Sequence, residues 1–70
     1  MIYFFSKGRE YLECEIQPGQ PHVLTLVAPD GAAQSERYAS GSDLIERLEQ
    51  LTVSMADEGW QGPFGRDPRA

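Results

Sequence analysis

The first half of the chain alternates short runs of β-forming residues with breaks rich in glycine and proline, and this pattern is typical of successive β-hairpins. The runs lie at residues 2–6, 10–17, 22–28 and 34–38. The breaks contain Gly8, the segment Pro18 to Pro21 and Pro29-Asp30-Gly31, in which proline presets φ and glycine accepts positive φ. Breaks this short join neighbouring antiparallel strands. The sequence therefore predicts a three- to four-stranded antiparallel β-meander.

The strands differ in how they distribute apolar residues between their two sides. The second run places Leu12, Cys14 and Ile16 on one face and Tyr11, Glu13 and Glu15 on the other. The run from His22 to Ala28 is apolar on both sides, which is typical of a strand in the interior of a sheet. The run from Gln34 to Tyr38 is short and polar, as expected for an edge strand.

One amphipathic helix is predicted from about Asp43. Its apolar stripe consists of Leu44, Leu48, Leu51 and Met55, with Ile45 beside it. Ser42 is the candidate N-cap, and Gly59 supplies the residue that ends the helix in the left-handed region. Trp60 is expected to fold back over the last turn, and Pro63 prevents continuation.

These elements predict an α+β domain, in which one amphipathic C-terminal α-helix packs on one face of the sheet. The domain spans residues 1–60, and residues 61–70 form a polar, mobile tail. The predicted core consists of Leu12, Cys14, Ile16, Leu24, Leu26, Leu44, Leu48, Leu51, Met55 and Trp60. A single helix leaves the other sheet face uncovered, and there we expect Tyr11, Val23, Thr25 and Val27 to form a partly apolar interaction face.

The charge and cysteine content narrow the classes of function. Eleven acidic residues against six basic ones give a net charge of −5, which opposes non-specific binding to phosphate backbones and anionic lipid. One cysteine cannot close an internal disulfide. The apolar start is too short for a signal peptide, and no stretch approaches a membrane span. The sequence predicts a cytoplasmic protein that does not bind membranes.

Four features could carry chemistry, and each has a simpler structural explanation. Cys14 lies between apolar neighbours on one strand face, and His22 is an isolated imidazole at a strand start. Glu13 and Glu15 share a strand face about 7 Å apart, but no predicted cleft would shift their proton affinities. Ser40-Gly41-Ser42 fits helix capping better than phosphate binding. We therefore predict no enzyme activity, no catalytic residues, no cofactor and no metal site.

Single-stranded nucleic-acid binding is the alternative function. The residues that could stack on or pair with such a strand are Tyr3, Tyr11, Tyr38, Lys7, Arg9 and Arg37. The predicted β-β-β-β-α order resembles the whirly and coactivator-type single-stranded-DNA-binding proteins in element order alone, over about residues 2–60. Any basic track is interrupted by Glu10, Glu13, Glu15 and Glu36.

A second resemblance covers nearly the whole chain. It rests on Val27-Ala28-Pro29-Asp30-Gly31, on Ser35-Glu36-Arg37-Tyr38, on the leucine-spaced helix and on Gly59-Trp60-Gln61-Gly62-Pro63. These segments resemble a group of short, uncharacterised bacterial proteins with a β-meander and one C-terminal helix. The group has no established activity, so the resemblance implies a fold and assigns no functional residue.

The leading hypothesis is a non-enzymatic protein-interaction module. It follows from the small core and from a sheet that has apolar residues on both faces but only one helix to cover them. The expected partner is another protein or a second copy of the chain, with a homodimer forming through the uncovered sheet face.

Overall fold

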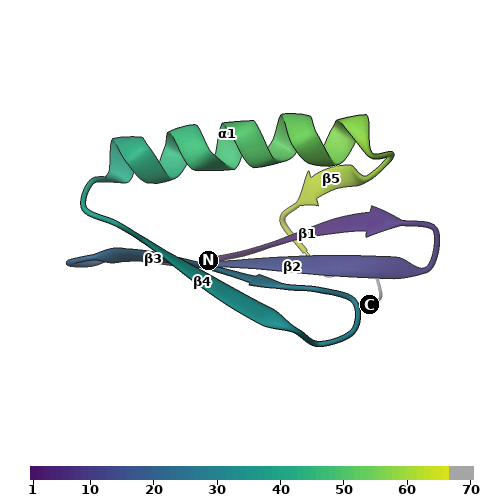
Figure 1. Cartoon of the computed structure of the whole chain (residues 1–70), viewed down its shortest axis with the longest axis horizontal. Coiled ribbons are helices and arrows are strands. Elements are labelled where there is room, and N and C mark those ends of the chain that lie inside the picture. The colour runs from purple at the N-terminus through teal and green to yellow at the C-terminus, as the bar shows by residue number, and fades with distance from the viewer. Residues whose placement is uncertain (67–70) are drawn as a thin grey trace.

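The computed structural model describes residues 1–66 and contains one five-stranded antiparallel sheet crossed on a single face by one helix (Figure 1). The elements are β1 Ile2–Lys7, β2 Glu10–Gln17, β3 His22–Val27, β4 Ala33–Tyr38, α1 Gly41–Asp57 and β5 Gln61–Phe64. The strand order is β4-β3-β2-β1-β5, so β1 to β4 form a meander and β4 lies at one edge. The predicted α+β fold class is confirmed, with one strand more than the sequence predicts.

Glycine forms the turns that join the first four strands where positive φ is required. Gly8 has φ 62° between β1 and β2, and Gly31 has φ 91° between β3 and β4. The second turn is closed by a hydrogen bond from the Gly31 N–H to the Ala28 carbonyl at 2.9 Å. The Ala32 N–H also donates to Oδ1 of Asp30 at 2.9 Å. The Pro29-Asp30-Gly31 segment thus forms the turn that its residue types favour.

The N-terminus of α1 lies two residues before the predicted position, because Ser40 and not Ser42 is the N-cap. Ser40 keeps an extended backbone, with φ −126° and ψ 152°. Its Oγ accepts a hydrogen bond from the Asp43 N–H at 3.2 Å, and its carbonyl accepts one from the Leu44 N–H at 3.3 Å. The helix therefore begins as soon as the chain leaves β4, with only a short link between them.

The C-terminus of α1 closes with two reversed hydrogen bonds. The Trp60 N–H donates to the Met55 carbonyl at 2.9 Å, and the Gly59 N–H donates to the Ala56 carbonyl at 3.0 Å. Gly59 has φ 92°. This arrangement is a Schellman motif, in which the left-handed residue allows the chain to turn back on the last helical turn. Trp60 consequently packs against the core beside Met55.

The structure corrects the predicted tail, because Gln61–Phe64 form β5 beside β1. Gly62 has φ 132°, and a Cβ atom at this position would lie 2.8 Å from the Phe4 carbonyl oxygen. Only glycine lets the backbone approach β1 so closely. A glycine and a proline that are read as breaks in the sequence therefore belong to an irregular strand. Residues 67–70 of the predicted tail lie outside the described residues.

The core fills the space between α1 and the sheet. Its buried members are Phe5, Cys14, Ile16, Leu24, Leu44, Leu51 and Met55. Partly buried side chains pack around them, namely Tyr3, Leu12, Leu26, Tyr38, Leu48 and Trp60. These two groups contain all ten residues that the sequence places in the core, together with three aromatic residues that it does not. Ile45 is 58% exposed, so it lies outside the helical stripe.

Candidate functional site

The sheet face opposite α1 carries the four residues that the sequence singles out for an interaction. We call this surface the open face, and on β1 to β4 it consists of Ile2, Phe4, Ser6, Tyr11, Glu13, Glu15, Gln17, Val23, Thr25, Val27, Ala33, Ser35 and Arg37. Directly paired residues of neighbouring strands share a face, which places Val27 beside Glu13 and Thr25 beside Glu15. No helix or strand among residues 1–66 lies over it (Figure 1).

The four predicted residues, Tyr11, Val23, Thr25 and Val27, are all half-exposed. The hydroxyl groups of Thr25 and Ser35 lie 3.0 Å apart in a cross-strand hydrogen bond. Cross-strand pairs of this kind hold the side chains in a fixed arrangement. The open face is therefore a surface on which apolar and polar side chains alternate.

A small pocket lies at the end of the open face nearest the β3–β4 turn. It has a volume of about 190 Å³ and is lined by Phe4, Tyr11, Glu13, Val27, Ala28, Pro29 and Gly31. Phe4 is only 7% exposed although it points away from α1. Because side chains alternate along β1, Tyr3 and Phe5 lie on the helix side and Phe4 lies on the open face. The pocket is smaller than the sites that usually hold cofactors or metabolites, and its size suits one side chain of a partner.

Two carboxylates occupy the middle of the open face. Glu13 and Glu15 are half-buried on β2, the central strand of the sheet. Gln17 Nε2 donates to Glu15 Oε1 at 3.3 Å. The one ion pair within residues 1–66 joins two other side chains, so neither carboxylate has a cation within 4.0 Å there. Negative charge that is not neutralised within the domain favours a cationic group on whatever binds this surface.

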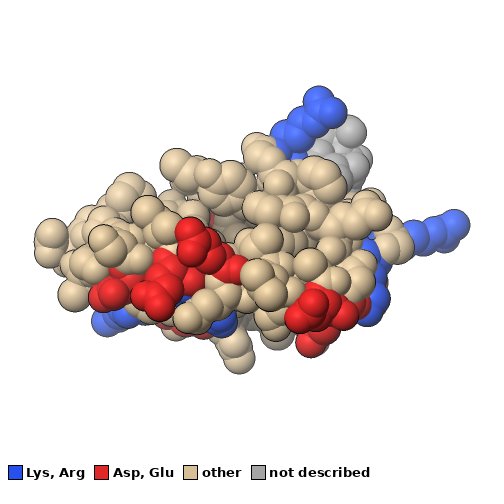
Figure 2. Space-filling model, turned by 90° about the horizontal axis from the view of Figure 1, so that it is seen from above, with Lys and Arg blue, Asp and Glu red and all other residues tan. Residues whose placement is uncertain are grey.

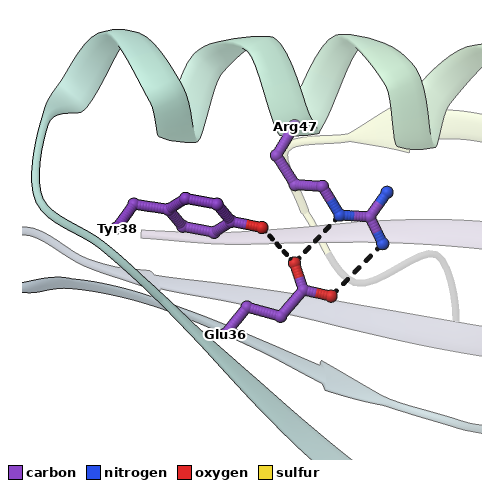
Figure 3. Close-up of polar contacts among 3 residues, drawn as sticks. All are labelled: Glu36, Tyr38 and Arg47. Atoms are coloured by element: carbon purple, nitrogen blue, oxygen red, sulfur yellow. Dashed lines mark hydrogen bonds and ion pairs between the residues drawn. The ribbon is translucent and has the colours of Figure 1, made fainter.

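A paired carboxylate lies on the opposite side of the sheet, where β4 meets α1. Glu36 Oε1 accepts from Arg47 Nε at 2.9 Å, and Oε2 accepts from Arg47 Nη2 at 3.2 Å (Figure 3). The Tyr38 hydroxyl also donates to Glu36 Oε1. The hydrogen bonds from Arg47 and then from Tyr38 lower the pKa of the Glu36 carboxyl. This bidentate contact links α1 to the edge strand β4. The Glu36 carboxylate is engaged in it and is not free to act as a catalytic acid or base.

Cys14 lies in the core and lacks the features of a nucleophile. Its side chain is 1% exposed. Burial, and then the nearby Glu13 carboxylate, raises the pKa of the Cys14 thiol to about 11. A reactive cysteine needs its thiolate form and access to substrate, so the packing at this position supports a structural role.

His22 and the serine-rich loop also have structural partners. His22 lies at the start of β3, and its Nδ1 accepts a hydrogen bond from the Gly19 N–H at 3.4 Å. The imidazole thus braces the turn between β2 and β3. In the segment Ser40-Gly41-Ser42, Ser40 caps the helix with its hydroxyl. Neither position supplies the groups that a catalytic or phosphate-binding site would need.

The residues of the nucleic-acid alternative are divided between the two faces. Tyr3 and Tyr38 pack against the core on the helix side, whereas Tyr11 belongs to the open face. The open face carries Arg37 at one edge and Glu13 and Glu15 at its centre. A stacking platform for single-stranded nucleic acid requires aromatic rings on one surface beside a continuous basic track. The arrangement of these residues does not provide that combination.

A second apolar surface, which the sequence did not indicate, flanks the helix. A pocket of about 230 Å³ between α1 and β1 is lined by Tyr3, Phe5, Cys14, Leu48, Thr52 and Pro63. Ile45 and Val53 beside it are 58% and 63% exposed. Seen from the helix side, acidic side chains gather along one part of the molecule, and a largely uncharged, hollowed area lies beside them (Figure 2). We call Ile45, Leu48, Thr52, Val53 and Pro63 the helix flank.

Within residues 1–66, no group of three or more His, Cys, Asp or Glu side chains is placed to hold a metal ion. The one helix of this part of the chain is too polar and too short to cross a membrane. Comparison of the chain with protein-family models, curated proteins and solved structures finds no match. The function must therefore be argued from the surfaces described above.

Proposed function

We propose that the chain is a non-enzymatic protein-interaction module that binds a partner protein on the open face. The observation that carries this proposal is a sheet with one face packed under α1 and the other uncovered within residues 1–66, although the half-exposed Tyr11, Val23 and Val27 give it apolar character. Apolar surface that remains outside a core is typical of a contact site.

The charges of the open face define the chemistry of the partner. Glu13 and Glu15 lie at its centre without a cation of their own. If two copies packed face to face, these carboxylates would be enclosed with those of the second copy at the low dielectric of an interface. A partner segment with apolar side chains and a lysine or arginine between them satisfies both features. We therefore favour a different protein over a second copy as the occupant of the open face.

The helix flank is the rival surface, but its geometry is less suited to a broad contact. Ile45 and Val53 are eight residues apart on α1, which separates them by about 12 Å along the helix. Glu49, an exposed charged residue, lies between them. Its pocket opens beside Pro63 of β5. The open face instead presents neighbouring side chains from four paired strands.

Two matched variants distinguish these surfaces. Val27→Lys places a charge on the open face, beside Glu13, and Val53→Lys makes the same change on the helix flank. The tagged full chain and both variants are used for affinity capture from cells that contain the natural chain, followed by quantitative mass spectrometry. We expect a protein that the wild type and Val53→Lys both retain and that Val27→Lys loses by about tenfold or more. Thermal unfolding of the purified variants confirms that each is folded.

The partner's charge is tested with the double variant Glu13→Gln/Glu15→Gln. We expect the same protein to be captured less strongly and with a weaker dependence on salt. If Val53→Lys lost the partner and Val27→Lys retained it, the result would contradict the proposal and assign binding to the helix flank. Equal retention by both variants would also contradict it.

A further inference from the structure

The two edges of the sheet differ in how well they can receive another strand. The β5 edge is four residues long, contains Pro63 and shifts its register against β1. The β4 edge is six residues long and pairs with β3 without a break, from His22↔Tyr38 to Val27↔Ala33. It contains neither proline nor glycine. Shortness, proline, irregular register and charged side chains are devices by which proteins protect exposed edges. β5 combines the first three, whereas β4 has only the charges of Glu36 and Arg37.

The outer backbone groups of β4 have no partner within residues 1–66. No strand lies beyond β4 in the sheet, and no backbone hydrogen bond of a turn, loop or cap involves residues 33–38. The charge on Glu36, which could repel an approaching strand, is neutralised by Arg47. The edge therefore offers a regular ladder of donors and acceptors without a local barrier to pairing.

We propose that β4 pairs antiparallel with β4 of a second copy, about a two-fold axis that passes through Ser35. In this register Ser35 lies opposite Ser35, Gln34 opposite Glu36, and Ala33 opposite Arg37. Ala33, Ser35 and Arg37 lie on the open face, and Gln34 and Glu36 lie on the helix side. Each cross-strand pair thus joins side chains on the same face, as antiparallel pairing requires.

The charges on β4 disfavour two neighbouring registers. Moving the axis to Glu36 would place two carboxylates opposite each other, and moving it to Arg37 would place two guanidinium groups opposite each other. Like charges at directly opposed positions destabilise a strand pair. With the axis at Ser35, no like charges are opposed, and the Gln34 amide faces a carboxylate that accepts hydrogen bonds. The hydroxyl groups of Thr25 and Ser35, 3.0 Å apart, then lie beside the same two hydroxyl groups of the second copy across the axis.

The helix leaves this edge accessible. α1 packs against β3 and β5 as well as β4, so it lies over the sheet and not beyond its edge (Figure 1). A two-fold axis perpendicular to the sheet puts both open faces on the same side of one continuous sheet. A partner with two matching segments would then bind both at once, with the gain in avidity that linked sites provide. The pairing itself does not depend on what binds the open face.

Substituting Ala33 with a negatively or a positively charged residue tests both the pairing of the two β4 edges and its register. The full chain, Ala33→Glu and Ala33→Lys are compared by sedimentation equilibrium from about 1 μM to 1 mM. We expect the wild-type mass to rise with concentration towards twice 7.8 kDa. Ala33→Glu faces Arg37 of the second copy and should lower the dimer Kd, whereas Ala33→Lys should raise it, each by about three- to tenfold.

The chain's overall charge predicts the reverse order, because it is −5 and an added lysine reduces general repulsion. Only local pairing with Arg37 makes the glutamate variant the tighter dimer. A wild-type chain that remains a monomer at the highest concentration would overturn the proposal. It would also be overturned if the two Ala33 variants moved the Kd in the same direction. The same would hold if Val27→Lys abolished the dimer while neither Ala33 variant changed its Kd. None of these results bears on capture of a different protein by the open face.

Discussion

The two faces of the sheet are built from the same strands but reach different states of burial. On the helix side Leu24 and Cys14 are 0% and 1% exposed, and α1 seals the cluster around them. On the open face their neighbours Val23, Thr25 and Val27 remain half-exposed. The alternation of side chains along a strand supplies apolar residues to both faces, but residues 1–66 contain only one helix to cover them.

Their carboxylates show the same contrast. Glu36 on the helix side is held by Arg47 and Tyr38, whereas Glu13 on the open face has no cation within reach among residues 1–66. One face thus satisfies its polar groups internally and contributes stability. The other keeps half-exposed apolar side chains and two carboxylates that no cation within residues 1–66 neutralises. In so small a domain, the proposed site lies where the core leaves the sheet uncovered.

The largest expected difference between the faces is in the free energy of unfolding. Leu24→Ala creates a cavity in the sealed core and should lower the free energy of unfolding by about 2–5 kcal/mol. Val23→Ala, one position away on the open face, should lower it by about 1 kcal/mol or less. Urea unfolding followed by tryptophan fluorescence measures both. Equal losses would mean that the open face is packed as tightly as the core.

A smaller difference is expected for the two carboxylates. Glu36→Gln removes the charge held by Arg47 and should lower the Tm by about 2–5 °C at neutral pH, whereas Glu13→Gln should leave it unchanged or raise it. Because the pKa of Glu36 is lowered in the folded chain, its contribution is complete above its unfolded value of about 4.3. It is lost as the pH falls through the lowered folded value.

Calorimetry across this pH range provides the check. The gap in Tm between the wild type and Glu36→Gln should close as the medium becomes acidic. A gap that stays constant with pH would show that the loss at neutral pH comes from altered packing and not from the charge. A fall in Tm for Glu13→Gln as large as for Glu36→Gln would remove the distinction between the two faces.

Much of the fold could be predicted because strong local signals agreed with one another. The alternation of residues 10–17, the turn at Pro29-Asp30-Gly31 and the end of the helix at Gly59 each depend on neighbours in the chain. Features that depend on distant contacts were missed. β5 forms because Gly62 can lie against Phe4, which is far away in the sequence. Ser40, and not Ser42, is the N-cap because β4 ends just before Ser40.

The candidate site was predicted in part for the same reason. Tyr11, Val23, Thr25 and Val27 were assigned to one face by strand alternation alone, and the structure brings them together there. The sequence could not show that Phe4 joins them, because the register of β1 decides which aromatic residue points away from α1. It also could not show the helix flank, because one of its residues, Pro63, belongs to β5, which the sequence did not predict.

The most direct test of the open face is site-specific photo-crosslinking in living cells. Benzoylphenylalanine replaces Thr25 at the centre of the open face or Val53 on the helix flank, and the full chain is irradiated and analysed by mass spectrometry. The account predicts a covalent adduct with a different protein from position 25 and none with that protein from position 53. An adduct from position 53 with no adduct from position 25 would contradict it.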